Sequence, residues 1–289
     1  MTIMLTGATG YLGTRIGNML LGRGHRVIAL HLNRSERFEC SEALESNVFR
    51  VYLSESGVDY AFSKYKIDGV IHTATVYGRN HEDFATIIKA NVEFPVRVLS
   101  MAIASNVRFF INTDSILKRN VSPYALSKGQ FLDWMSMASQ EILTVNMKLD
   151  HFYGPGEKNI KFVAKVLSEL KANVPRLHLT VGTQTRDFIY VDDVVSAYMY
   201  VIDGLDSFHK GVVNNFEVGT GVRTSIRSLV TMAKELTASS SELGFGDVPL
   251  REHEMLDYEI NSSPLRALGW KPEVLVREGL KRCIDKYIA

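Results

Sequence analysis

The most informative segment for the fold is Thr2-Ile3-Met4-Leu5-Thr6-Gly7-Ala8-Thr9-Gly10-Tyr11-Leu12-Gly13, near the amino terminus. It opens with a short apolar run of strand character, and three glycines follow at regular spacing. Apolar residues then recur at helical spacing until Gly22 and Gly24 supply a stop. A second apolar run covers residues 25–32. The stretch therefore predicts a strand–helix–strand unit with a glycine turn at its first junction.

The spacing of these glycines suits a dinucleotide. Gly7 allows a tight turn, Gly10 lets the backbone approach a pyrophosphate, and Gly13 lets the helix pack closely on the strand. The helix amino terminus would face the phosphates. A glycine turn without a ligand is disfavoured, because strand, turn, helix and second strand all occur in order. The predicted cofactor-binding residues of the turn are Gly7, Thr9, Gly10, Tyr11, Leu12 and Gly13.

The end of the second strand selects the dinucleotide. An acidic residue there would bind the ribose 2′-hydroxyl of NAD, but residues 31–35 contain none. Asn33 and Arg34 occupy the position, with Arg37 behind them, and a guanidinium can meet a 2′-phosphate. NADP(H) is therefore predicted in preference to NAD(H). A solvated charge cluster is the alternative.

Strands and helices continue to alternate along the chain. We expect strands at 48–53, 68–73 and 143–151 and a further strand that begins at Phe109, with helices at 58–66, at 81–104 with an interruption at Pro95, and from Tyr124. Later helices are expected at 160–171 and 225–236. Such alternation indicates an α/β fold with a Rossmann-type, doubly wound parallel sheet. No internal repeat or low-complexity tail interrupts it.

A polar set follows the strand that begins at Phe109. Thr113 should lie at its carboxyl end, and Tyr124 and Lys128 lie one helical turn apart on the next helix. A hydroxyl, a phenol and an ammonium together are a plausible proton-transfer set. Lys128 would favour the ionised phenol and lower the pKa of Tyr124. Alone, the pair is more often an ordinary surface Tyr and Lys.

Composition excludes several classes of function. The chain has 289 residues, 46% hydrophobic and 22% charged, and a net charge of +1. Nucleic acid is a poor candidate partner for such a charge, and no apolar run is long enough to cross a bilayer. The two cysteines, Cys40 and Cys283, show no metal-ligand spacing and suggest a reducing compartment. A strand begins within a few residues of the start, so we expect no signal peptide and a cytoplasmic protein.

With these segments placed, the chain resembles the extended short-chain dehydrogenase/reductase family, also called the NAD-dependent epimerase/dehydratase family. The likeness covers essentially the whole length. Its motifs are the glycine turn, His72-x-Ala74, Asn91, Thr113 with Tyr124-x-x-x-Lys128, Tyr153-Gly154-Pro155-Gly156, Arg186-Asp187-Phe188 with Val191-Asp192-Asp193, and Leu268-Gly269-Trp270-x-Pro272. Within the family, bacterial synthases of deoxy and dideoxy sugars look most similar, and those reduce nucleotide-linked 4-keto sugars.

The resemblance implies roles for particular residues. Tyr124 would be the general acid, Thr113 would orient the substrate carbonyl, and Lys128 would hold the nicotinamide ribose. His72, Ala74 and Asn91 would belong to the cofactor site. The expected substrate contacts are Tyr77, Arg79, Asp114, Ser115, His151, Arg186 and Arg251. For Arg79 and His151, a solvated arginine and a structural histidine are the alternatives. No metal is expected.

The same resemblance divides the chain. Residues 1–151 would form the dinucleotide-binding domain, with 187–216 returning to it. Residues 152–186 and 217–289 would form a smaller nucleotide-sugar-binding lobe. The family commonly dimerises through a four-helix bundle, built from the helix of Tyr124 and the long helix before it. Trp134, Met135 and Met137 add apolar surface there. A homodimer is therefore expected.

Several reactions remain open. The first hypothesis is an NADPH-dependent reductase of a nucleoside-diphosphate-linked 4-keto-6-deoxy or 3,6-dideoxy sugar, in bacterial surface-polysaccharide synthesis. A 4,6-dehydratase would carry a glutamate after Thr113-Asp114, whereas this chain has Ser115, which cannot act as a base at neutral pH. A 4-epimerase using bound NAD is the third reading. A non-enzymatic NADP-binding module is disfavoured by the retained Thr113, Tyr124 and Lys128.

Overall fold

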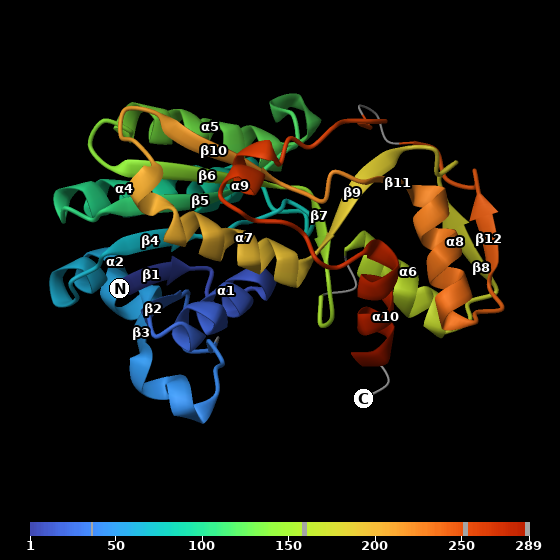
Figure 1. Ribbon diagram of the computed structural model, residues 1–289, viewed down its shortest axis with the longest axis horizontal. Helices are drawn as coiled ribbons and strands as arrows, with labels where there is room; N and C mark the ends of the chain where they lie inside the picture. The colour runs from blue at the N-terminus through green and yellow to red at the C-terminus, as the bar shows by residue number, and fades with distance from the viewer. Residues whose placement is uncertain (36, 158–160, 251–253, 287–289) are drawn as a thin grey trace. The chain divides into compact units, whose positions relative to one another are not determined.

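A computed structural model describes residues 1–35, 37–157, 161–250 and 254–286 (Figure 1). The chain divides into two compact units. The first comprises Met1–Leu149 and Tyr198–Phe216, and the second comprises Asp150–Ala197 and Glu217–Ala289. The segment that returns to the first unit therefore begins at Tyr198, and residues 187–197 belong to the second unit.

The first unit is built on a seven-stranded sheet with the order β10-β6-β5-β4-β1-β2-β3. Its strands are β1 (Thr2–Thr6), β2 (Arg26–His31), β3 (Val48–Tyr52), β4 (Gly69–His72), β5 (Phe109–Ser115), β6 (Leu143–Leu149) and β10 (Val213–Val218). From β3 across to β6 every neighbouring pair is parallel. The order reverses direction between β1 and β4, which is where a doubly wound sheet binds its ligand. The predicted fold class is confirmed.

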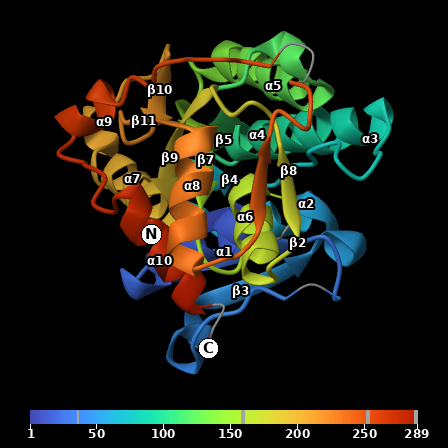
Figure 2. The ribbon, with the colours of Figure 1, turned by 90° about the vertical axis from the view of Figure 1, so that its right-hand side faces the viewer.

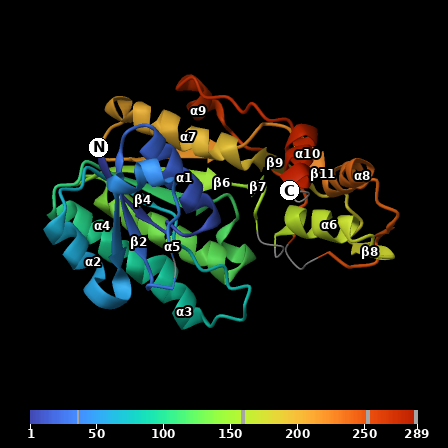
Figure 3. The ribbon, with the colours of Figure 1, turned by 90° about the horizontal axis from the view of Figure 1, so that it is seen from below.

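Helices cover both faces of this sheet. They are α1 (Tyr11–Gly22), α2 (Leu53–Lys64), α3 (Phe84–Ile88), α4 (Phe94–Ala104), α5 (Pro123–Ala138) and the part of α7 (Val191–Asp203) after Ala197, with short turns η1 (Glu42–Asn47), η3 (Arg119–Val121) and η4 (Leu205–Ser207). Figure 3 shows α2, α4 and α5 on one face and α1 on the other. Buried Phe110 and Phe131 meet edge to face between β5 and α5. Apolar burial of this kind supplies most of the stabilisation.

The helix expected at 81–104 begins later and changes its winding. It starts at Phe84, where the Asp83 side chain accepts a hydrogen bond of 2.7 Å from the Thr86 amide. A π-helical turn, η2 (Lys89–Glu93), then separates α3 from α4. Pro95 has no N–H to donate, and a wide turn before it accommodates the lost hydrogen bond. The same turn carries Asn91 inward, where it is 1% exposed.

The second unit has two small sheets. One contains β7 (His151–Tyr153), β9 (Thr185–Tyr190) and β11 (Arg223–Ser225), and the other contains β8 (Arg176–Leu179) and β12 (Glu242–Phe245). Its helices are α6 (Phe162–Lys171), α8 (Ile226–Thr237), α9 (Ser263–Ala267), α10 (Val276–Lys286) and the first part of α7. Figure 2 shows α6, α8 and α10 together. An apolar cluster including Leu167, Leu229 and Leu280 forms the core.

The strand expected at 143–151 is two strands. β6 ends at Leu149, and β7 starts at His151 in a different sheet. Asp150 stands between them, and its carboxylate accepts a hydrogen bond of 3.1 Å from the Asp187 amide on β9. An apolar, β-prone run gave no sign of this break, because the change of sheet is fixed by pairing with distant strands.

Asp193, in the first turn of α7, bonds to a distant turn of the second unit. Its carboxylate accepts hydrogen bonds of 3.0 Å from the amides of Glu273 and Val274. The indole of buried Trp270 donates a hydrogen bond of 2.9 Å to Oγ of Ser196, which lies on α7 as Asp193 does. Asp193 therefore fixes the turn before α10, which explains a buried carboxylate at that position.

Candidate active site

The glycine turn after β1 fits closely against the end of β4. Gly7 has a φ of +66°, and a Cβ on it would lie 2.7 Å from the Ala74 amide nitrogen. A Cβ on Gly13 would lie 2.0 Å from the Gly7 carbonyl oxygen. Neither position can accept a side chain without moving backbone. The turn is therefore built as predicted, at the switch point of the sheet.

The amino terminus of α1 is suited to phosphate. Gly10 is the residue that precedes the helix. No side chain caps the helix, and the first helical turn carries no acidic residue. The first N–H groups and the positive end of the helix dipole therefore face outward. Arg15 lies over the Tyr11 ring, with its guanidinium carbon 4.0 Å from the ring centre. These residues fit a dinucleotide. Leu12 is buried, so it would contribute through its backbone.

The end of β2 carries no carboxylate among its described residues. Asn33 Oδ1 accepts hydrogen bonds from Ser35 N at 3.0 Å and Ser35 Oγ at 2.5 Å, which shapes the loop. The Arg34 guanidinium lies 4.9 Å from the Tyr52 ring centre. Arg37 is paired with Glu45 at 3.1 Å. Both arginines lie in the loop that follows β2.

His72 and Asn91, both predicted for the cofactor site, have buried side chains. The His72 ring is 0% exposed, packs on Phe131 and lies 2.8 Å from Thr6 Oγ1 through Nδ1. Burial lowers the pKa of His72 well below its usual value, so the ring is neutral. The imidazole packs in the core of the first unit, and its place in the cofactor site stays a prediction.

Asn91 ties the loop after β4 to α5. Its Oδ1 accepts from the Val76 amide at 2.8 Å, and its Nδ2 donates to the Val76 carbonyl at 2.8 Å and to Ser127 Oγ at 3.0 Å. Ser127 Oγ in turn donates to the Tyr124 carbonyl at 2.8 Å. Asn91 therefore positions the backbone around Tyr124, and its side chain is fully used in doing so.

Tyr124 and Lys128 lie in the first two turns of α5. Ser122 caps this helix by accepting from the Ala125 amide at 3.1 Å. Lys128 is 3% exposed, and burial lowers its pKa to about 8, against the opposing effect of Asp114. Tyr124 stacks on Tyr77 at 5.0 Å between ring centres, and the Arg79 guanidinium lies 5.4 Å from the Tyr77 ring. Tyr77 and Arg79 are therefore neighbours of Tyr124, as a substrate role requires.

The expected direction of the Tyr124 pKa is wrong for the protein chain itself. Burial, with smaller contributions from Tyr77 and Asp114, raises the pKa of Tyr124 well above its usual value, and Arg79 opposes this. Desolvation exceeds the attraction of nearby cations. Tyr124 is therefore a protonated phenol at neutral pH, the form that a proton donor needs.

Thr113 has a partner that the sequence did not suggest. Its Oγ1 lies 2.6 Å from the hydroxyl of Tyr198, on α7. Tyr198 also adds to the rise in the Tyr124 pKa, so both candidate catalytic residues lie near this phenol. No motif marked Tyr198, because it is one aromatic residue among the apolar positions of a helix. Only its packing reveals it.

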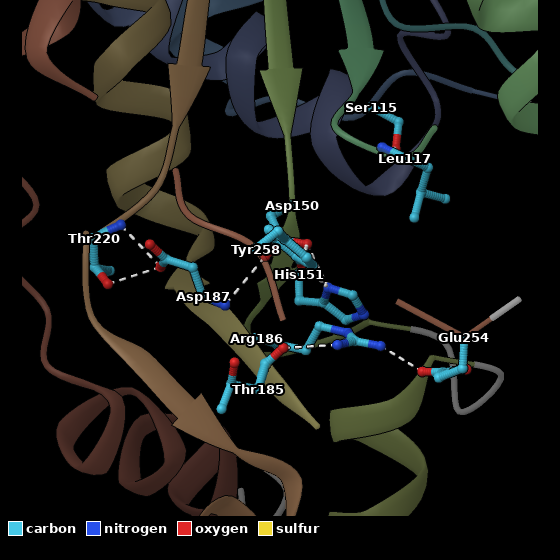
Figure 4. Close-up of polar contacts among 10 residues, drawn as sticks. All are labelled: Ser115, Leu117, Asp150, His151, Thr185, Arg186, Asp187, Thr220, Glu254 and Tyr258. Atoms are coloured by element: carbon cyan, nitrogen blue, oxygen red, sulfur yellow. Dashed lines mark hydrogen bonds and ion pairs between the residues drawn. The ribbon is translucent and has the colours of Figure 1, made fainter. Parts of the chain in front are cut away.

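Asp114 and Ser115 follow Thr113 but are turned to the protein. Asp114 is 6% exposed, and its carboxylate accepts from Asn146 Nδ2 at 2.9 Å and from the Ser115 amide at 2.7 Å. Ser115 Oγ accepts from the Leu117 amide at 3.2 Å (Figure 4). These contacts hold Asp114 and Ser115 at the end of β5, and their contact with substrate stays a prediction.

Two further predicted substrate contacts lie in the second unit, each beside an acidic residue (Figure 4). His151 Nδ1 is 2.5 Å from the buried Asp150 carboxylate, which also accepts a hydrogen bond from Tyr258. Arg186 is 6% exposed and forms an ion pair with Glu254. The third contact, Arg251, lies outside the described residues.

Asp187, next to Arg186, serves the backbone. Its carboxylate accepts a hydrogen bond from the Thr220 amide at 2.9 Å (Figure 4). It also accepts one from the Gly221 amide at 2.7 Å. In the described ranges no group of three metal-ligating side chains occurs, and no helix has the length and hydrophobicity of a membrane span.

A glycine turn at the switch point of a doubly wound sheet, with Thr113 on β5 and Tyr124 and Lys128 on α5, is the arrangement of a dinucleotide-binding α/β protein. The sequence pattern of the NAD dependent epimerase/dehydratase family matches residues 3–219. The chain belongs to this family, as the resemblance implied.

Known proteins agree with this assignment. CDP-abequose synthase of Salmonella muenchen is 31% identical to this chain, in an alignment that covers 98% of this chain and 97% of the relative. UDP-glucose 4-epimerase of Mycolicibacterium smegmatis is 26% identical to this chain, in an alignment that covers 99% of this chain and 98% of the relative. The structure of MoeE5 in complex with UDP-glucuronic acid and NAD shares the fold, with a TM-score of 0.85, 21% identity and coverage of 100% and 99%.

Proposed function

We propose that this protein is an NADPH-dependent reductase of a nucleoside-diphosphate-linked 4-keto-6-deoxy or 3,6-dideoxy sugar, acting in the cytoplasm in bacterial surface-polysaccharide synthesis. The observation that carries the proposal is the placement of Tyr124 and Lys128 one turn apart on α5, after the strand-end Thr113, in a chain 31% identical to a CDP-abequose synthase. A reductase needs a proton donor at the carbonyl oxygen, and the phenol of Tyr124, protonated at neutral pH, can supply that proton.

The roles follow from the described contacts. When bound, the reduced nicotinamide supplies the hydride to C4. The Tyr124 hydroxyl donates its proton to the developing alkoxide, and Thr113 Oγ1 holds the same oxygen by a hydrogen bond. Lys128, its charge supported by Asp114, binds the ribose. Arg34 binds the 2′-phosphate of NADPH, with Asn33 shaping the loop.

Substrate recognition is assigned by chemistry. Tyr77 and Arg79 neighbour Tyr124 and suit the sugar and its diphosphate. In the second unit, His151, Arg186 and Arg251 are assigned to the substrate as well. Arg186 would exchange its Glu254 partner for phosphate oxygens.

The alternatives are a 4-epimerase and a 4,6-dehydratase. The Mycolicibacterium relative is a UDP-glucose 4-epimerase, and epimerisation would use the same Tyr124 with bound NAD. Elimination needs a base after Asp114, and the Ser115 hydroxyl there accepts a hydrogen bond from the Leu117 amide. Ser115 therefore disfavours the dehydratase.

The test is reduction of a panel of CDP-, dTDP-, GDP- and UDP-linked 4-keto-6-deoxy sugars, followed by the absorbance of NADPH. Stoichiometric consumption of NADPH is expected with one of them. Turnover without net consumption would identify an epimerase or dehydratase instead. No reduction of any substrate would overturn the proposal.

We also propose a homodimer through a four-helix bundle that includes α5. Phe84 and Ile88 on α3, and Trp134 and Met137 on α5, are exposed by 72%, 49%, 54% and 78%. Such an apolar face is typical of an interface. Met135 is 0% exposed and belongs to the core, so it does not contribute as expected. Sedimentation should show a dimer, and Trp134→Glu with Met137→Glu should give a monomer; a dimer that survives both changes contradicts the interface.

A further inference from the structure

The hydrogen bond between Thr113 and Tyr198 joins a partly exposed hydroxyl to a fully buried one. Tyr198 lies 85 positions from Thr113 in the sequence, and the two oxygens are 2.6 Å apart. The Tyr198 side chain is 0% exposed. Thr113 is partly exposed, at the carboxyl end of β5. One end of the hydrogen bond is therefore closed to water while the other can meet a substrate.

The burial of Tyr198 decides which oxygen donates. A phenol carries one proton, and a buried hydroxyl that donates to nothing is costly. Among the described residues, Thr113 is the partner recorded for the Tyr198 hydroxyl. Tyr198 must therefore donate to Thr113 Oγ1. A threonine oxygen that accepts this bond keeps its own proton for another acceptor.

We propose that Tyr198 is a positioning residue, which donates to Thr113 and thereby directs the Thr113 proton toward the substrate carbonyl oxygen. With the opposite polarity, Thr113 would spend its proton on Tyr198 and could offer that carbonyl only lone pairs. The role rests on the proposed reduction, or on any reaction in which charge develops on the same oxygen.

Tyr198 is not a second acid. A catalytic acid must regain its proton after each turnover, and this side chain has no exposed surface through which to do so. Burial also raises the pKa of Tyr198 above its usual value, so it stays protonated as a fixed donor. Tyr124, which is partly exposed, keeps the role of acid.

The first test is a double-mutant cycle on activity. Tyr198→Phe should lower kcat about tenfold with KM changed less than about twofold, since one orienting hydrogen bond is lost. In a Thr113→Val background, the same Tyr198→Phe change should have no further effect. Tyr200→Phe, two residues along the same helix and 39% exposed at that position, is the matched control and should match the wild type. An equal loss in both backgrounds, or none in either, overturns the proposal.

The second test needs no substrate. Thr113→Val leaves the Tyr198 hydroxyl buried and unpaired, so it should lower Tm, and adding Tyr198→Phe should restore part of that loss. Additive changes in Tm would overturn the proposal whatever the reaction is. If the wild type reduces no nucleotide sugar, the proposed function fails, while this cycle still decides whether the two hydroxyls are coupled.

Discussion

The candidate catalytic residues of the first unit and the candidate substrate residues of the second are held in different ways. Thr113 is held by a phenol, and the backbone around Tyr124 by Asn91 through Ser127. His151 and Arg186 are held by the carboxylates of Asp150 and Glu254. Neutral partners fix a group without opposing its charge, which suits proton transfer. The Glu254 carboxylate can be exchanged for an anionic ligand, which suits binding.

The largest effect should come from Tyr124. Tyr124→Phe removes the proton donor, so kcat should fall by about 10²–10⁴-fold, the usual contribution of general acid catalysis. Steady-state kinetics with NADPH and the best nucleotide sugar measure this, and Tyr200→Phe is the control. Activity within a few fold of the wild type would remove Tyr124 from the mechanism.

Lys128 should show the opposite effects on activity and stability. Its folded pKa of about 8 lies below its value in the unfolded chain, so burying the ammonium costs stability below that pH. Lys128→Met should therefore lose most of its activity and yet unfold at higher denaturant concentration at pH 7, by a gain of roughly 3 kcal/mol.

The sign of this effect follows from the proton balance. As the pH rises from about 8 toward 10.5, the folded lysine loses its proton first, so wild-type stability rises and the advantage of Met shrinks. Wild-type activity should decline above about pH 8, if the ammonium is the active form. A stability gain independent of pH would contradict the assignment to Lys128.

Arg34 tests the choice of cofactor. Arg34→Ala should raise the KM for NADPH by about tenfold or more and change the KM for NADH by about twofold or less. The reason is that the guanidinium pairs with the 2′-phosphate, which NADPH has and NADH lacks. Arg37→Ala is the matched control, since Arg37 is paired with Glu45. Equal effects on both cofactors would favour NAD.

Glu254 should give the smallest effect and sharpen the contrast most. Glu254→Gln weakens the ion pair with Arg186, so an anionic substrate should bind better and its KM should fall about two- to fivefold. Glu259→Gln, at an exposed position in the same segment, is the control. A rise in KM would mean that Glu254 itself contacts substrate or that the ion pair holds Arg186 in place for binding.

Local pattern was enough to predict much of the fold and part of the site. The glycine turn, the alternation of strands and helices, and the spacing of Tyr124 and Lys128 depend on neighbours a few residues apart. The parallel sheet followed from that alternation, and its order places the turn at the switch point. Boundaries were less accurate at Asp150, where the chain changes sheet.

Local sequence was sufficient to identify the chemical groups of the site: three glycines, a strand-end threonine, and a tyrosine and lysine one turn apart. The tertiary structure decided their states. Burial sets the protonation of Tyr124 and Lys128, and it separates Met135 in the core from Met137 on the surface. Long-range packing brings Tyr198 to Thr113 across 85 positions of sequence. Desolvation and such contacts depend on residues far apart in the chain, so no local pattern could reveal them.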